Sequence, residues 1–73
     1  MKDFKITVGS LPDKNNLVAD IFYENIQVAE ISNENNEFLI QIYCYKDKDY
    51  WEFSLDEFQK VVEKAKQKLI AIG

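Results

Sequence analysis

The boundary at Ser54 constrains the fold of this chain more than any other feature of its sequence. Ser54 and Glu57 have the spacing of a capping box, in which the serine hydroxyl accepts a hydrogen bond from the Glu57 N–H and the glutamate reaches back to the Ser54 N–H. Phe53 and Phe58 stand at the two positions of a hydrophobic staple. The sequence therefore predicts that an α-helix begins here and covers residues 55–70.

An apolar stripe follows this boundary. Its members recur at alternating spacings of three and four, with Val61 beside them: Leu55, Phe58, Val62, Ala65, Leu69 and Ile72. Such a helix buries one face, and a helix of this length is marginally stable alone in water, so we expect it to pack on a sheet of the same chain. A coiled coil is disfavoured because the stripe covers fewer than three heptads.

The rest of the chain shows strand patterns separated by polar turns. Apolar and polar residues alternate with period two, or β-branched and aromatic residues are dense, in segments at about 3–8, 17–24, 26–32, 37–45 and 50–53. Short connections such as Glu24-Asn25 favour antiparallel pairing of consecutive strands. We therefore predict a single α+β domain over residues 1–73, with an antiparallel β-meander of about four to five strands and one C-terminal α-helix packed on one face.

One helix leaves the other face of such a sheet without cover from the chain. The alternation places a mixture of apolar and acidic side chains on that open face: Phe22, Val28, Leu39, Tyr43, Tyr45, Asp20, Glu24 and Glu30. We take these residues as the candidate interaction face.

The charge of the chain favours a basic partner. Nine lysines against thirteen acidic residues give a net charge of −4, and between Asn15 and Tyr45 the chain has no lysine. This balance argues against general affinity for nucleic acid or for an anionic membrane. The helix ridge of Lys60, Lys64 and Lys68, together with the chain's tyrosines, leaves single-stranded nucleic-acid binding as a third function.

Residues for catalysis are scarce. The chain has no His and no Arg, so it lacks the commonest general base and the usual anion clamp, and we expect no enzyme activity, no cofactor and no metal site. Cys44 is the one cysteine, which excludes an intramolecular disulfide, and its strand position predicts a small buried residue. Trp51 is expected to close the core beside the staple. No long apolar segment indicates export or a membrane span, so a cytoplasmic protein is expected.

The segments at 6–12, 29–32 and 51–57, the last before a lysine-rich helix, carry a resemblance to known sequences. With Ile6-Thr7-Val8-Gly9-Ser10-Leu11-Pro12, Ala29-Glu30-Ile31-Ser32 and Trp51-Glu52-Phe53-Ser54-Leu55-Asp56-Glu57, the chain resembles a group of small uncharacterised bacterial proteins of about this length. In size, acidity and lack of chemistry it is similar to immunity proteins of toxins. We therefore expect a non-catalytic acidic protein-binding module, an immunity-type inhibitor of a basic protein being one form of it. The alternative is a homodimer that pairs through its open sheet face or an edge strand.

Overall fold

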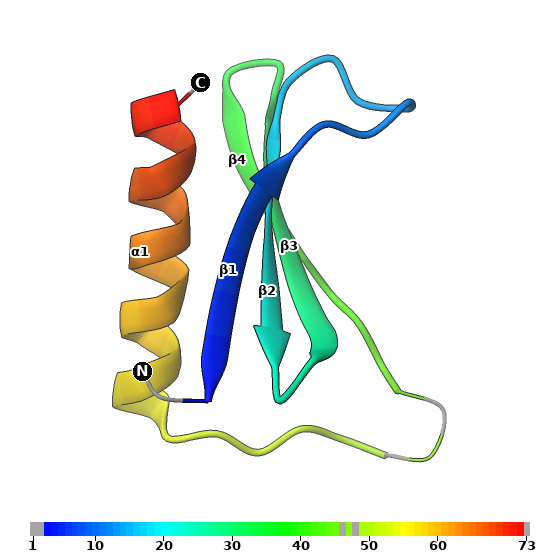
Figure 1. Ribbon diagram of the computed structural model, residues 1–73, viewed down its shortest axis with the longest axis vertical. Helices are drawn as coiled ribbons and strands as arrows, with labels where there is room; N and C mark the ends of the chain where they lie inside the picture. Colours follow the sequence, from blue (N-terminus) through cyan, green and yellow to red (C-terminus); the bar gives the residue numbers. More distant parts are fainter. Residues whose placement is uncertain (1–2, 46, 48, 73) are drawn as a thin grey trace.

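The protein is an antiparallel four-stranded sheet with one helix across a face. The computed structural model describes residues 3–45, 47 and 49–72. The strands are β1 (Phe4–Gly9), β2 (Val18–Tyr23), β3 (Ile26–Glu34) and β4 (Glu37–Ile42), paired in the order β1-β2-β3-β4, and the helix α1 (Leu55–Ile72) follows (Figure 1). The predicted α+β meander with one C-terminal helix is confirmed.

Two tight turns connect the last three strands. Glu24 and Asn25 have φ angles of 48° and 70°, and Asn35 and Asn36 have φ angles of 55° and 63°. Hairpins with two-residue turns require such left-handed residues, and asparagine tolerates them better than most residues do. The turn predicted at Glu24-Asn25 is confirmed. The second turn is shorter than the polar run suggested, because β3 continues to Glu34.

The helix begins where the sequence predicts. The Glu57 N–H donates to Ser54 Oγ at 3.3 Å, and the Phe58 N–H donates to the Ser54 carbonyl at 2.9 Å. The rings of Phe53 and Phe58 stack with centroids 5.4 Å apart, as a hydrophobic staple requires. The helix then runs two residues beyond the predicted end, to Ile72.

The predicted fifth strand at 50–53 does not form. This segment crosses below the sheet towards the start of α1 without pairing with a strand (Figure 1). Its aromatic side chains pack instead: Trp51 Nε1 donates to the Tyr43 carbonyl at 3.1 Å, and the Trp51 ring stacks on Phe53 with centroids 5.6 Å apart. Aromatic residues that favour strands are used here to join the sheet to the helix. The turn predicted at Lys46-Asp47-Lys48-Asp49 lies partly outside the described residues.

The core lies between α1 and the first three strands. Val61, Ala65 and Leu69, spaced four residues apart, are the buried residues of the helix and pack in one cluster with Ile21 and Ile31 of the sheet. Leu55 and Ile72, expected in the stripe, are 70% and 60% exposed. The buried face of α1 is therefore shorter than the predicted stripe, which included Leu55 and Ile72 at its two ends.

A β-bulge changes the alternation in β3. The register of β2 with β3 shifts between Ile21 and Phe22, because Ile21 pairs with Ala29 whereas Phe22 pairs with Gln27. Val28 is the extra residue of this bulge and is fully buried in the core cluster. A period-two pattern cannot anticipate an inserted residue, which is why Val28 was assigned to the open face.

Candidate functional site

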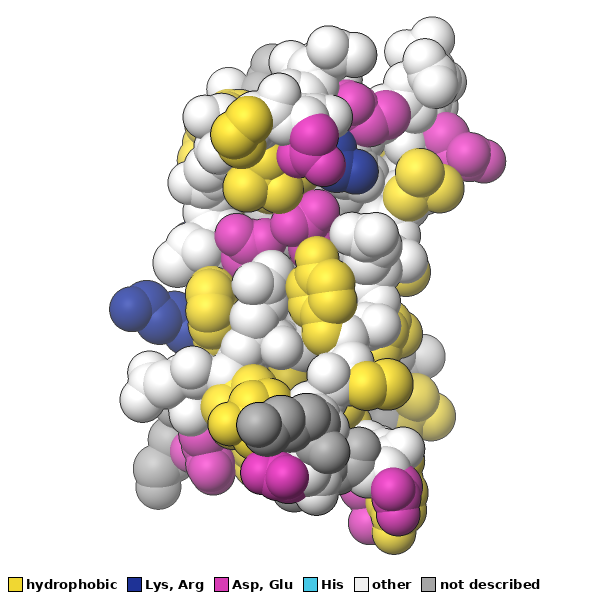
Figure 2. Space-filling model, turned by 90° about the vertical axis from the view of Figure 1, so that its right-hand side faces the viewer, with side chains coloured by type: hydrophobic (Ala, Val, Ile, Leu, Met, Phe, Trp, Pro, Cys, Tyr) yellow, Lys and Arg dark blue, Asp and Glu magenta, His cyan; other side chains and the backbone are white. Residues whose placement is uncertain are grey.

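The face of the sheet turned away from α1 brings together several of the predicted interaction residues. The register pairs Asp20 with Glu30, and Glu30 with Gln41, on this face. Phe22 lies on the same side of β2, and Leu39 on the same side of β4. Figure 2 looks onto this side of the molecule and shows acidic side chains near its centre, with hydrophobic ones separated around them. We call this surface, defined by Asp20, Phe22, Glu30, Leu39 and Tyr43, the open face.

The centre of the open face is a polar network. Gln27 Nε2 donates to Asp20 Oδ1 at 3.0 Å, and Asp20 lies opposite Glu30 in the register of β2 with β3. The Tyr43 hydroxyl donates to Gln41 Oε1 at 3.2 Å. Glu30 is only 5% exposed. Two carboxyl groups therefore lie opposite each other at the middle of the sheet.

This arrangement shifts two titrations. Burial raises the pKa of the Glu30 carboxyl, and the hydrogen bond and the charge of Asp20 raise it further, against a smaller opposing effect of Lys14. Burial also raises the pKa of the Tyr43 phenol, with added contributions from the charges of Glu30 and Asp20. Both shifts disfavour the negatively charged form of the group, first because burial removes water from it and then because acidic neighbours repel the charge.

The remaining predicted interaction residues lie elsewhere or at the border. Val28 is buried in the core and offers no surface. Glu24 is exposed in the turn between β2 and β3, and Tyr45 is 46% exposed beyond the end of β4. The open face is therefore a polar centre with scattered hydrophobic side chains, and less apolar than the sequence suggested.

A second surface, at the edge strand β4, was not predicted in this form. Phe38, Ile40 and Ile42 face the helix side of the sheet, because Ile40 pairs with the buried Ile31 and lies in line with its two neighbours. They are nevertheless 39%, 43% and 63% exposed. The reason is width: a helix is about 10 Å across, whereas four strands at about 4.8 Å spacing extend over about 14 Å. Since α1 packs on β1, β2 and β3, the row on β4 remains uncovered.

The main chain of this same row also points outward. In an antiparallel ladder, successive residues direct their N–H and C=O groups alternately towards the neighbouring strand and away from it. The Tyr43 N–H donates to the Val28 carbonyl of β3 at 2.9 Å. By alternation, Phe38, Ile40 and Ile42 direct their main-chain groups away from β3. We call these three residues the β4 edge row.

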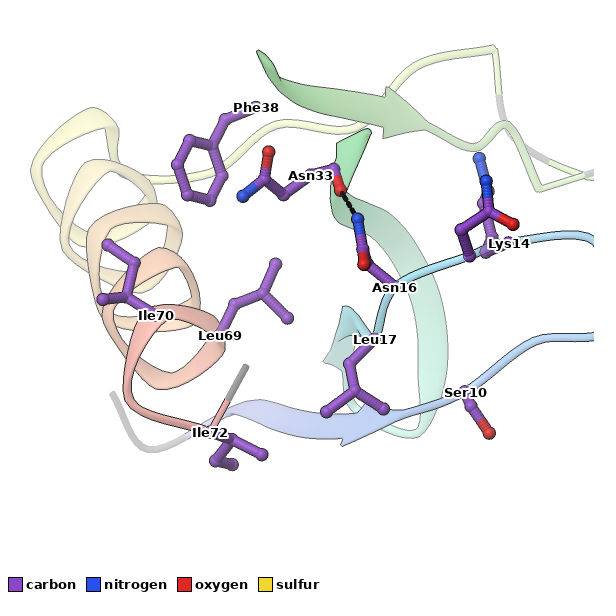
Figure 3. A pocket seen from close by; sticks show the side chains of 10 residues that line it. Ser10, Lys14, Asn16, Leu17, Asn33, Phe38, Leu69, Ile70 and Ile72 are labelled. Carbon is purple, nitrogen blue, oxygen red and sulfur yellow. Dashed lines mark hydrogen bonds between the residues drawn. The ribbon is translucent and has the colours of Figure 1, made fainter. Parts of the chain in front are cut away.

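A hollow of about 520 Å³ lies at one end of this row, beneath the β3–β4 hairpin. Phe38 faces Leu69 and Ile70 of α1 across it, and Asn16 from the β1–β2 loop donates to the Asn33 carbonyl at 2.6 Å (Figure 3). Lys66 of the helix lies 5.1 Å from the centre of the Phe38 ring. The hollow is thus bounded by hydrophobic side chains of α1 and β4 on one side and by mostly polar residues of the β1–β2 loop on the other.

The lone cysteine lies in neither surface. Cys44 is a free, exposed thiol, because β4 ends two residues before it, and the prediction of a buried position was wrong. Among the described residues, no group of three or more His, Cys, Asp or Glu side chains is placed to hold a metal ion. In the same part of the chain, no helix combines the length and the apolar character needed to cross a membrane.

Comparison of the chain with models of protein families, with curated proteins and with solved structures finds no match. The functional argument therefore depends on the open face and the β4 edge row themselves.

Proposed function

We propose that this protein is a non-catalytic binding module whose open face engages a basic protein partner. The observation that supports the proposal is the pair of carboxyl groups, Asp20 and Glu30, which lie opposite each other at the centre of a sheet face that the helix does not cover. An immunity-type inhibitor of a basic protein is one form that such a module would take.

A lysine or arginine side chain fits this centre. Burial and the neighbouring carboxyl group of Asp20 raise the pKa of Glu30, so its ionised form is disfavoured in the free protein. A cation placed between the two carboxylates would supply charge-assisted hydrogen bonds and bring the pKa of Glu30 down. The hydrophobic side chains of Phe22 and Leu39 lie on the same face and would contact the surroundings of that cation. The net charge of −4 would add long-range attraction.

Other functions have less support. The acidic centre of the open face would repel the phosphates of a nucleic acid, and the lysines of α1 lie on the same helix as acidic residues such as Glu57 and Glu63.

Non-catalytic binding agrees with a sequence that has neither His nor Arg. The exposed free thiol of Cys44 fits a reducing compartment, which supports our expectation of a cytoplasmic protein.

The test compares partner capture by three forms of the immobilised protein: the wild type, Glu30→Gln and Glu63→Gln. Both substitutions remove one negative charge, but Glu63 is exposed on α1, away from the open face. We expect a basic protein to be retained in stoichiometric amount by the wild type and by Glu63→Gln, and to be lost with Glu30→Gln. Retention should also fall as the salt concentration rises.

Two results would refute the proposal. The first is that no stoichiometric partner is retained from the native host. The second is that a partner is retained equally by Glu30→Gln and the wild type, because binding would then not depend on the acidic centre.

A further inference from the structure

We infer that the β4 edge row is a homodimer interface, at which β4 of one copy pairs antiparallel with β4 of a second copy about a two-fold axis. The inference goes beyond the proposed function, since it concerns a different surface and a different partner. It rests on three observations: an edge without the usual protection, a sequence that is complementary to itself, and a nearly uncharged strand.

Edge strands in monomeric proteins are usually protected against pairing with another chain. Lysine or proline on the strand, a bulge, or a cover by other elements serves this purpose. β4 has no lysine and no proline over its six residues, and its register with β3 has no shift. All six residues are exposed. The other edge strand, β1, carries the exposed Lys5 in its interior and is contacted by α1.

A two-fold axis through Ile40 aligns the outward groups of β4 with those of a second copy. In this register Ile40 stands opposite Ile40, and Phe38 stands opposite Ile42, so every member of the β4 edge row meets another member. Each such pair would exchange two main-chain hydrogen bonds, roughly six in all. A register centred on Leu39 is less favourable, because it pairs Phe38 with Ile40 and leaves Ile42 without an opposite residue within the strand.

The charge on this surface favours a second copy over a basic partner. Glu37 is the one charged residue of β4, and in the register centred on Ile40 it falls opposite Tyr43 of the second copy rather than opposite an acidic residue. Asp20 and Glu30 lie on the open face, whereas β4 presents Phe38, Ile40 and Ile42. A nearly neutral, apolar edge is complementary to itself and offers little to a cationic segment.

This dimer would join two sheets into one with eight strands, with both helices on the same side. Because the axis is perpendicular to the sheet, the two open faces would lie together on the other side and remain free. Homodimer formation and binding of a basic protein are therefore compatible. The contact is a single pair of edge strands and so belongs to the small end of interface sizes, and we expect a weak dimer that dissociates on dilution.

The first test is sedimentation equilibrium of the full chain over a wide concentration range. We expect the wild type to pass from monomer to dimer, and Ile40→Lys to remain monomeric over the same range. Ile72→Lys is the matched control, because Ile72 is 60% exposed at the end of α1, outside the β4 edge row, and the same exchange there should leave the dimer unchanged. Circular dichroism checks that both variants fold. Glu30→Gln should dimerise like the wild type, which separates this test from that of the open face.

The second test determines the register by disulfide cross-linking in a Cys44→Ser background. Ile40→Cys places the two thiols opposite each other at the axis, whereas Ile42→Cys places each thiol opposite Phe38. We expect the disulfide dimer to form at least tenfold faster at position 40. Exposure alone predicts the opposite order, because Ile42 is 63% exposed and Ile40 is 43% exposed.

Three results would overturn the inference. One is a wild type that remains monomeric at every concentration. Another is a dimer that survives Ile40→Lys. The third is cross-linking that is faster at position 42 than at position 40, because it would mean that the thiols meet by random collision.

Discussion

Two phenylalanines of this protein should respond very differently to the same substitution. Phe53 lies among four other aromatic rings: its ring centroid is 5.1 Å from Phe4, 4.9 Å from Tyr23, 5.6 Å from Trp51 and 5.4 Å from Phe58. Burying a phenylalanine contributes up to about 3 kcal/mol, and each aromatic pair adds about 0.5–1.5 kcal/mol. Since Phe53 is partly exposed, we expect Phe53→Ala to lower the free energy of unfolding by about 3 kcal/mol.

Phe38→Ala is the matched control. The Phe38 ring is 39% exposed, and the lysine Lys66 is 5.1 Å from its centre. An exposed contact of this kind contributes about 0.5–1 kcal/mol, so the loss should stay near 1 kcal/mol. For a domain of this size the difference between the two variants corresponds to about 8–16 °C in Tm.

Urea denaturation followed by circular dichroism measures both variants. The fluorescence of Trp51 is unsuitable as the sole probe, because Trp51 stacks on Phe53 and its signal will change with the substitution itself. The measurement should use a protein concentration at which the wild type is monomeric in the sedimentation test. Equal losses for Phe53→Ala and Phe38→Ala would refute the reasoning, because the aromatic cluster would then contribute no more to stability than an exposed edge residue.

Three further substitutions test other parts of the fold. Ser54→Ala removes the acceptor of the Glu57 N–H and should cost about 1 kcal/mol in urea denaturation, whereas Ser10→Ala in an exposed loop should change stability by less than about 0.5 kcal/mol. Val61→Ala empties a fully buried site and should cost about 2–3 kcal/mol, more than Val62→Ala, and equal losses would contradict the assigned core. Glu30→Gln tests the raised pKa of Glu30. The carboxyl proton of Glu30 is released at lower pH in the unfolded chain than in the folded chain. The free energy of unfolding of the wild type should therefore fall as the pH rises from about 4.5 through the folded pKa. Thermal denaturation from pH 4 to pH 8 should show that Glu30→Gln removes this loss and is the more stable form at pH 8; a constant difference between the two forms across that range would show that the pKa is not raised.

The parts of the fold that depend on interactions between residues close in the sequence could be predicted from the sequence. The hydrogen bond from the Glu57 N–H to Ser54 Oγ and the stacking of Phe53 on Phe58 are local patterns that act over a few residues, and both were found where predicted. The turn at Glu24-Asn25 follows from the backbone preferences of asparagine. Alternation also placed Asp20 and Glu30 on one face, because their strands are regular at that point.

Features that depend on the relative position of elements were missed. Val28 lies in the core and not on the open face, because a bulge adds one residue to β3 at this point. The alternation of apolar and polar residues in the sequence does not reveal such a bulge. The fifth strand was wrong because the propensity of Tyr50 to Phe53 cannot distinguish pairing from aromatic packing. The β4 edge row could have been suspected from the ratio of one helix to several strands. Which strand the helix would leave uncovered depends on where α1 packs, and this is a tertiary property.

The position of α1 also has a consequence for the order of folding. The strands of the sheet pair with their neighbours in the sequence, so the hairpins can form early, on a timescale of about 1–10 µs each. The helix that closes the core follows all four strands in the sequence and packs mainly on β2 and β1, which come first. During synthesis the apolar side of the sheet therefore stays exposed until residues 55–72 have left the ribosome. The chain is expected to gain protection against proteases in one late step, when α1 docks on the completed meander.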